Sequence, residues 1–233
     1  MTLLKPLNHP ARIKYEQSNK ISNDLYWNLH TKFLVPTQIK INVTDFQHDM
    51  LHYQDFFKPW GNNRSELNDI RKGLPLVNLN GKFDGNLDES IGPLDYYNTN
   101  NPDTPLLEYD FTRQTQVLDC ASLEPLYVLR KYMTRSSILY WKKGANFSPH
   151  WDVMLPAINL RLWGTDNPDS MSLRYKKNNE MIECKNIEAG RLYLIETSTV
   201  HDARCINTEL YQFFISLNIN SFELVKSLTQ PTI

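Results

Sequence analysis

The stretch Phe147–Asp152 reads FSPHWD, and the rest of the chain is organised around it. His150 and Asp152 are two residues apart, and alternate side chains of an extended strand point to the same face. An imidazole and a carboxylate at this spacing therefore project side by side. They can bind adjacent positions on one metal ion, which makes the stretch a candidate metal site.

A second imidazole would complete a donor set of two histidines and one carboxylate, the set that non-haem Fe(II) sites use. His201 is the candidate, because it follows the strand-like run Arg191–Ile195. The alternative interpretation is structural, with His150 and Asp152 hydrogen-bonded to nearby backbone at a strand end. His48 and His52 also share a helix face at i and i+4, but the chain lacks the glutamate of the His-Glu-x-x-His zinc motif there, so we expect an ordinary helix face.

From residue 135 onward the sequence predicts one short strand after another, separated by turn residues such as Asn178 and Asn179. Seven β-rich segments at this spacing are typical of a β-sandwich or barrel. The expected class is therefore α+β, mainly β. The expected strands are 137–141, 149–153, 157–163, 172–175, 181–184, 191–195 and 211–219.

The first half of the chain predicts a mixture of elements: strands over 37–43 and 74–79, and helices over 46–57 and 120–133. Thr44 or Asp45 would cap the first helix and Ser122 the second. Residues 61–110 are rich in turn residues, and we expect a lid loop over 80–105 at the mouth of a site, or else a surface excursion without a role. The chain is expected to be a single domain, 1–233, in which residues 1–134 wrap a β core over 135–220.

Composition excludes several classes of function. The net charge of −1 gives no electrostatic footprint for nucleic acid or an anionic membrane surface. No apolar run approaches the ~20 residues needed to span a bilayer, and the N-terminus lacks the pattern of a secretory signal. Cys120, Cys184 and Cys205 are an odd number at wide spacing, which favours reduced thiols and a cytoplasmic location.

The run Ala157–Trp163 contains an arginine within an otherwise apolar strand. Arg161 would share a face with Asn159 and Trp163, opposite three aliphatic residues. A buried guanidinium needs a negative partner, and its planar fork suits a carboxylate. Arg161 therefore either faces the metal and holds an acidic cosubstrate, or pairs with an acid of the protein. Arg204 is the other cation near His201.

Three segments together resemble the Fe(II)/2-oxoglutarate-dependent dioxygenases, within them the aspartyl/asparaginyl β-hydroxylase-like branch, which includes free-proline hydroxylases. The segments are Pro149–Asp152, the run Asn159–Trp163 (NLRLW) and the run Gly190–Thr197 (GRLYLIET) that leads to His201. The resemblance covers about residues 136–219. It implies a double-stranded β-helix (jelly-roll, cupin-like) core, with N-terminal helices and long loops outside it.

The resemblance also implies site residues. His150, Asp152 and His201 would be the Fe(II) ligands and the catalytic residues, and Arg161 a cosubstrate contact, with Asn159 and Trp163 on the same strand. The family usually has an arginine about ten residues after the distal histidine, for the tail carboxylate of 2-oxoglutarate. This chain has Tyr211 there, so Arg161 or Arg204 takes that role, or the cosubstrate site is altered, or no cosubstrate is bound. Trp163 stands where the family usually has a histidine.

Three functions remain open at this stage. The first is an Fe(II)/2-oxoglutarate hydroxylase that uses O2 and acts on a peptide side chain or a free amino acid. The second is a cupin-like metalloprotein that does not use 2-oxoglutarate. The third is a non-catalytic β-sandwich binding module in which the histidines and the aspartate are structural. Iron binding separates the third from the other two.

Overall fold

Eight consecutive strands of the C-terminal half are divided between two antiparallel sheets. The computed structural model describes residues 33–59, 70–84, 110–150, 160–197 and 199–229. The larger sheet has the order β1-β10-β7-β12-β5-β3-β2, with β4 on β3, and the smaller one the order β6-β11-β8-β9. The eight strands are β5 (Ser136–Trp141), β6 (Asn146–His150), β7 (Leu160–Thr165), β8 (Met171–Lys177), β9 (Glu180–Glu183), β10 (Arg191–Ile195), β11 (His201–Cys205) and β12 (Leu210–Leu217).

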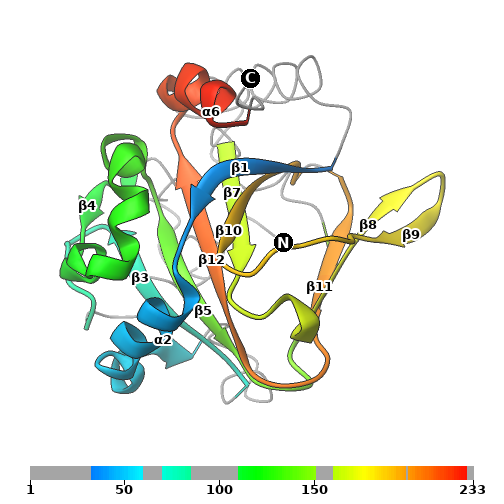
Figure 1. The fold of residues 1–233 in the computed structure, drawn as a ribbon, viewed down its shortest axis with the longest axis horizontal. Coiled ribbons are helices and arrows are strands. Elements are labelled where there is room, and N and C mark those ends of the chain that lie inside the picture. The colour runs from blue at the N-terminus through cyan, green and yellow to red at the C-terminus, as the bar shows by residue number, and fades with distance from the viewer. Residues whose placement is uncertain (1–32, 60–69, 85–109, 151–159, 198, 230–233) are drawn as a thin grey trace, which may run out of the picture.

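The chain changes sheet after every strand from β5 to β12 except between β8 and β9, which form a hairpin, and this is the topology of a jelly roll. Strands β5, β7, β10 and β12 lie in the larger sheet, and β6, β8, β9 and β11 in the smaller one (Figure 1). The predicted double-stranded β-helix core is therefore confirmed. The distal strand β11 was not predicted as a strand. The predicted strand over 149–153 is seen as β6, which begins earlier, and residues 151–153 lie outside the described residues.

The central strand β12 is covered on both faces, as its sequence predicts. Phe213 and Ile215 belong to a core between the larger sheet and the N-terminal elements. Phe214 packs against a second core, between the two sheets, whose members include Trp141 and Trp163. Alternation along one strand thus divides the hydrophobic residues between two cores, and polar side chains on the inner face come to lie between the sheets.

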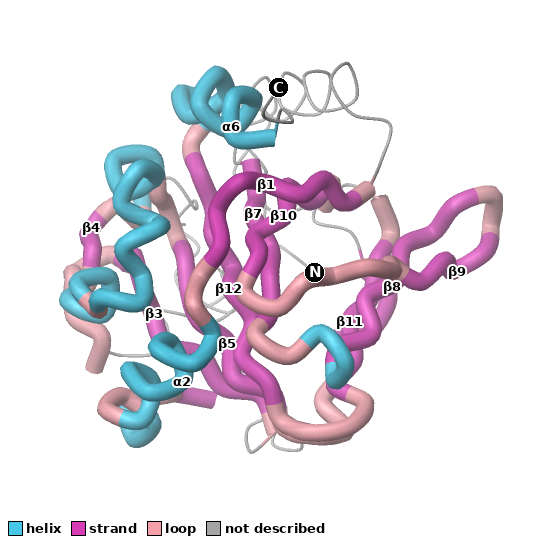
Figure 2. The backbone as a smooth tube through the Cα atoms, in the orientation of Figure 1, coloured by secondary structure: helices cyan, strands magenta, loops and turns pink. Residues whose placement is uncertain are grey.

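The N-terminal elements extend the larger sheet and cover its outer face (Figure 2). Strand β1 pairs with β10, and β3 with β5. The bounds of these elements are β1 (Leu34–Lys40), α2 (Val43–Leu51), η1 (Gln54–Phe56), β2 (Lys58–Pro59), β3 (Arg71–Asn78), β4 (Arg113–Gln114), η3 (Gln116–Asp119) and η4 (Ala121–Tyr132), and the remaining ones are η6 (Pro168–Ser170), η7 (Ile219–Ser221) and α6 (Phe222–Thr229). No helix among the described residues is long and apolar enough to cross a membrane.

Two predicted helices differ from those observed. Helix α2 begins at Val43 and not at residue 46, because the Asn42 side chain accepts the amide hydrogens of Thr44 and Asp45 and so caps it. It ends at Leu51, and η1 follows after a turn. The helix predicted over 120–133 is the 3-10 helix η4. Its apolar residues recur every third position, which matches three residues per turn.

The predicted lid loop over 80–105 lies mostly outside the described residues, which in this region end at Asp84. Its first part forms the turn after β3, where the Asn78 side chain accepts the amide hydrogen of Gly81. The predicted strand over 74–79 is β3, which begins at Arg71 and so is longer than expected.

Gly190 joins the N-terminal half to the jelly roll, and we expect Gly190→Ala to destabilise the protein by about 2–4 kcal/mol. Gly190 has φ +74°, and an added Cβ would lie 2.1 Å from the carbonyl oxygen of Ile41. Gly144→Ala is the matched control. It also has positive φ, but open space surrounds it, so only the backbone strain of about 1 kcal/mol is expected. Chemical denaturation of both variants measures the difference, and equal losses would contradict the steric explanation.

Candidate metal centre

His150 and His201 face each other across the smaller sheet. His150 is the last residue of β6 and His201 the first of β11, and the two are direct cross-strand partners. Their rings lie 4.4 Å apart, centroid to centroid, at an angle of 52°. The two residues are 51 positions apart in the sequence, and the pairing of β6 with β11 brings them together as predicted.

Hydrogen bonds to the backbone orient both rings in the same way. His150 Nδ1 lies 2.8 Å from the carbonyl oxygen of Ser148, and His201 Nδ1 lies 2.8 Å from that of Thr199. A carbonyl oxygen only accepts, so each Nδ1 carries the proton and donates it. In a neutral ring Nε2 then has the lone pair, which is the tautomer that a metal-binding histidine needs.

This donor set fits a divalent transition metal, because imidazole is a good ligand for iron, zinc, copper and nickel. Each ring is also held by a hydrogen bond from its Nδ1, which leaves Nε2 for the metal. The third predicted ligand, Asp152, lies outside the described residues. Within the described ranges, no group of three histidine, cysteine, aspartate or glutamate side chains is placed to hold a metal ion. The predicted triad therefore combines two histidines that the structure brings together with one aspartate that is known from the sequence alone.

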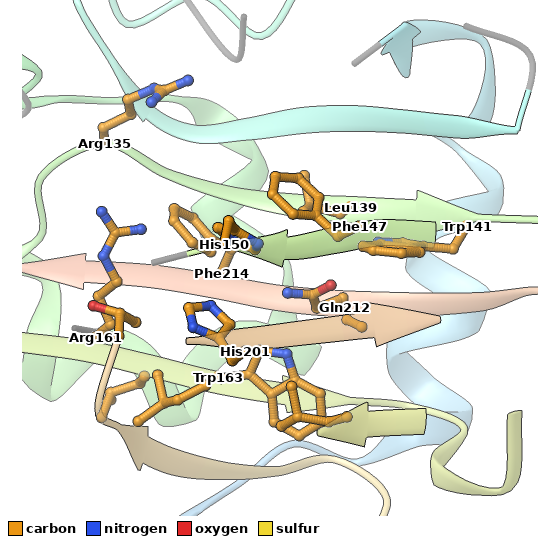
Figure 3. Close-up of a pocket in the computed structure, with 15 residues that line it drawn as sticks. Arg135, Leu139, Trp141, Phe147, His150, Arg161, Trp163, His201, Gln212 and Phe214 are labelled. Carbon is orange, nitrogen blue, oxygen red and sulfur yellow. The ribbon is translucent and has the colours of Figure 1, made fainter. Parts of the chain in front are cut away.

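A cavity of about 110 Å³ opens beside the histidine pair, between the two sheets (Figure 3). Its walls are mainly aromatic and aliphatic, and its polar members come from both sheets. The lining residues are Arg135, Leu139, Trp141, Phe147, His150, Arg161, Leu162, Trp163, Leu173, Ile195, Thr197, His201, Ala203, Gln212 and Phe214. A largely apolar lining with a few convergent polar groups is typical of small-molecule sites.

Arg161 lies in this cavity, as its position on a polar strand face predicts. Its side chain is 3% exposed, and the guanidinium carbon lies 4.7 Å from the centre of the Phe214 ring. Trp163 lines the same cavity, and Asn159 lies outside the described residues. Arg135, which the sequence analysis did not single out, adds a second buried guanidinium. Two buried guanidinium groups therefore line the cavity.

The structure does not bring Arg204 or Tyr211 into the cavity lining. Arg204 is half exposed, and its Nη2 lies 3.5 Å from Oδ2 of Asp202, which also pairs with Arg174. The Tyr211 ring lies against Phe46, 5.5 Å between ring centres, on the outer face of the larger sheet. Burial there raises the pKa of Tyr211. Side-chain alternation explains both placements, because the adjacent residues Ala203 and Gln212 point into the cavity.

Sequence reasoning did not single out most of the other lining residues, among them Arg135, Trp141 and Gln212. Gln212 carried a usable signal, because it shares a face of β12 with Phe214, opposite Tyr211. The sequence gave less indication for Arg135 and Trp141. The pairing of β5 with β12 and β3 determines which face of β5 turns inward, and that pairing is not visible in the sequence.

None of the three cysteines is among the residues that line the cavity. All three are free thiols, and burial raises the pKa of each, that of Cys184 to about 12. A thiol with a raised pKa is protonated at neutral pH and therefore a poor nucleophile. His48 and His52 lie 5.7 Å apart, centroid to centroid, on α2 and do not line this cavity.

Glu196 holds the backbone that orients His201. The buried carboxylate accepts the amide hydrogen of Thr199 at 2.8 Å, and the carbonyl of Thr199 accepts from His201 Nδ1. We expect Glu196→Ala to weaken Fe(II) binding by about tenfold, the usual effect of removing an outer-shell partner, and Glu196→Gln to retain it within about threefold, because the amide oxygen still accepts. Anaerobic calorimetry with Fe(II) measures both. Equal affinities for Glu196→Ala and the wild type would show that Glu196 does not position His201.

No family model matches the chain, and no curated protein sequence matches it. Among solved structures, it is similar to a prolyl hydroxylase from Trichoplax adhaerens in complex with a hypoxia inducible factor peptide, with a TM-score of 0.45 and 11% identity, over 97% of this chain and 99% of that one. It is also similar to a prolyl-4-hydroxylase from Pseudomonas putida, with a TM-score of 0.44 and 12% identity, over 86% and 98% of the two chains. These similarities concern the course of the chain alone.

Proposed function

We propose that this protein is an Fe(II)/2-oxoglutarate-dependent dioxygenase that hydroxylates a C–H bond of a peptide side chain or a free amino acid. The observation that carries the proposal is the pair formed by His150 and His201. Both rings are held by Nδ1 hydrogen bonds, both lie on paired strands of the smaller sheet, and both line a cavity that contains a buried arginine.

In this proposal His150, His201 and Asp152 hold the iron, with each imidazole binding through Nε2. Iron held by three protein ligands supplies oxidative chemistry with O2, coupled to decarboxylation of 2-oxoglutarate to succinate. The backbone carbonyls of Ser148 and Thr199 keep the two imidazoles in the tautomer that binds metal. Loss of either hydrogen bond would let the ring rotate away from the metal.

The remaining lining residues bind the ligand and exclude water. Arg161 offers its guanidinium to a ligand carboxylate, and burial strengthens that interaction because little solvent screens it. The faces of Trp163 and Phe214 close the cavity around the ligand. An apolar enclosure of this kind limits side reactions with water at a reactive centre.

The test is 2-oxoglutarate turnover by the Fe(II)-loaded protein in the presence of O2, followed as succinate by mass spectrometry. A panel of free amino acids and short peptides then identifies the substrate as the compound that gains 16 mass units and stimulates turnover. Succinate formation that requires Fe(II) and is lost in His150→Ala supports the proposal. Iron binding with no 2-oxoglutarate consumption would contradict it.

One observation favours a second candidate, a cupin-like metalloprotein that does not use 2-oxoglutarate. The family's usual arginine position falls at the start of β12, at Tyr211 or the adjacent Gln212. Tyr211 faces outward and Gln212 faces the cavity. No cation therefore stands at that position, and the cosubstrate site departs from the pattern of the dioxygenases that the sequence resembles. Metal binding without any effect of 2-oxo acids would favour this second candidate.

A further inference from the structure

The ring of His201 has a second aromatic neighbour, which comes from the N-terminal half of the chain. Phe33 lies just before β1, and its ring centre is 5.9 Å from that of His201, at an angle of 46°. Both residues are buried, with 4% of Phe33 and 7% of His201 exposed. Phe33 is not among the residues that line the cavity, so it packs against His201 from outside the cavity.

The ring of Phe33 is itself stacked on Tyr175. The two ring centres are 4.6 Å apart, and the ring planes are 6° from parallel. Tyr175 lies on β8 and is the direct cross-strand partner of His201 on β11. Side chains of direct partners lie side by side on one face of a sheet. The three rings therefore form one cluster, to which the smaller sheet contributes two members and the N-terminal half the third.

The backbone of Phe33 is connected to the same histidine by hydrogen bonds. The carbonyl oxygen of Phe33 accepts the amide hydrogen of Glu196 at 3.0 Å. The Glu196 carboxylate accepts the amide hydrogen of Thr199, and the carbonyl oxygen of Thr199 accepts from His201 Nδ1. Residue 33 is thus linked to His201 both by packing of its ring and by a series of three hydrogen bonds.

The surroundings of His150 are local by comparison. Its ring centre lies 4.2 Å from that of Phe147, which is three residues earlier on the same strand β6. Phe33 and His201 are instead 168 positions apart (201 − 33). Part of the packing around His201 therefore comes from outside the eight strands of the jelly roll.

We propose that Phe33 and Tyr175 are positioning residues, which hold the imidazole of His201 in the orientation that binds the metal. This inference rests on the proposed function, because it takes His201 to be an iron ligand. The hydrogen bond at Nδ1 fixes the tautomer, but rotation of an imidazole about its Cβ–Cγ bond has only a weak intrinsic preference. The packed ring of Phe33 restricts that rotation, and the stack with Tyr175 keeps Phe33 in place. The N-terminal half is then required to complete the metal centre.

The test compares Phe33→Leu with Phe46→Leu in the full-length protein. Each substitution replaces a buried ring with an aliphatic side chain, but Phe46 packs against Tyr211 and Phe213, on the outer face of the larger sheet. Co(II) is the probe, because its visible absorption depends on the geometry of its ligands. We expect Phe33→Leu to weaken Co(II) binding by about tenfold, the lower end of the effect of outer-shell partners, and to shift the absorption band. Phe46→Leu should destabilise the protein yet leave the affinity within about twofold and the band unchanged.

Tyr175 supplies a second pair of variants, because its side chain is only partly buried and its replacement disturbs the core less. Tyr175→Leu removes the stacked ring and should also weaken Co(II) binding and shift the band. Tyr175→Phe keeps the ring and should bind Co(II) as the wild type does.

Thermal denaturation of each variant confirms that it folds. An unchanged affinity and spectrum in Phe33→Leu and Tyr175→Leu would overturn the inference and leave the proposed function intact. The same change in Phe46→Leu as in Phe33→Leu would also overturn it, because the effect would then follow from lost stability. Failure of the wild-type protein to bind Co(II) or Fe(II) would contradict the proposed function itself.

Discussion

Replacing His201 with alanine is expected to reduce Fe(II) affinity by more than about 100-fold, beyond the 10- to 100-fold loss typical of outer-shell partners. His201 is buried, and its ring lies 4.4 Å from that of His150, so no other imidazole in the described residues can replace it. Anaerobic calorimetry with Fe(II) measures the affinity, and 2-oxoglutarate turnover should fall to background in the same variant.

The matched control is His48→Ala, which removes an imidazole from α2, outside the cavity. We expect it to leave Fe(II) affinity within about twofold of the wild type. A comparable loss in both variants would place the metal elsewhere. An unchanged affinity in His201→Ala would show that the histidine pair is a structural feature of the strand ends, as in the non-catalytic alternative.

Replacing Arg161 with alanine is expected to weaken 2-oxoglutarate binding by about 100-fold, with Fe(II) affinity changed by less than threefold. Truncation of a buried group that pairs with a charged ligand costs about 2–5 kcal/mol of binding free energy. A 100-fold loss of affinity corresponds to the lower part of that range. Arg161 lines the cavity and is 3% exposed. Calorimetry with 2-oxoglutarate on the Mn(II)-loaded protein gives the affinity, and Fe(II) titration of the same variant gives the second value.

Arg161→Lys and Arg204→Ala are the controls. Lysine keeps the charge and loses the planar fork, so an intermediate loss of about tenfold is expected if the contact is bidentate. Arg204 pairs with Asp202 outside the cavity lining, and its loss should leave 2-oxoglutarate binding unaffected. A variant Arg161→Ala that binds 2-oxoglutarate normally but unfolds more easily would identify Arg161 as the partner of a protein acid.

The short β-rich segments of the sequence predicted a β-sandwich or barrel, and the two-residue spacing of His150 and Asp152 predicted a metal site with His201 as a candidate ligand. The double-stranded β-helix was implied by the resemblance to the Fe(II)/2-oxoglutarate-dependent dioxygenases. The order of the strands in the two sheets confirms this part. Asp152 stays a prediction, because it lies outside the described residues.

The cavity residues expected to contact the cosubstrate were harder to predict, because alternate residues of a strand face opposite sides and the sequence does not fix which set faces the cavity. Tyr211 and Gln212 are adjacent in sequence, and a shift of one residue exchanges which of them faces the cavity. The sequence analysis placed Tyr211 at the position of the usual arginine, whereas the structure turns it against Phe46 and directs Gln212 inward. Arg204 follows the same rule, since Ala203 takes the inward position beside it.

Helix type was a further difference with a physical cause. Leu123, Leu126 and Leu129 recur every three residues, and all three are fully buried. In an α-helix, residues three apart are displaced from each other by about 60° around the axis, so the three leucines would lie on different faces. In a 3-10 helix, with three residues per turn, they lie on one face. The spacing of the leucines was present in the sequence, and it favours the shorter period over the one predicted.

The most direct test is an anaerobic titration of the metal-free protein with Fe(II) and then with 2-oxoglutarate. A 2-oxo acid chelated to Fe(II) gives a weak visible absorption band. We predict a band that requires both additions and is absent in His150→Ala, because that variant lacks one of the two oriented imidazoles. Fe(II) binding without a band would contradict the use of 2-oxoglutarate, and failure to bind Fe(II) would contradict the metal centre itself.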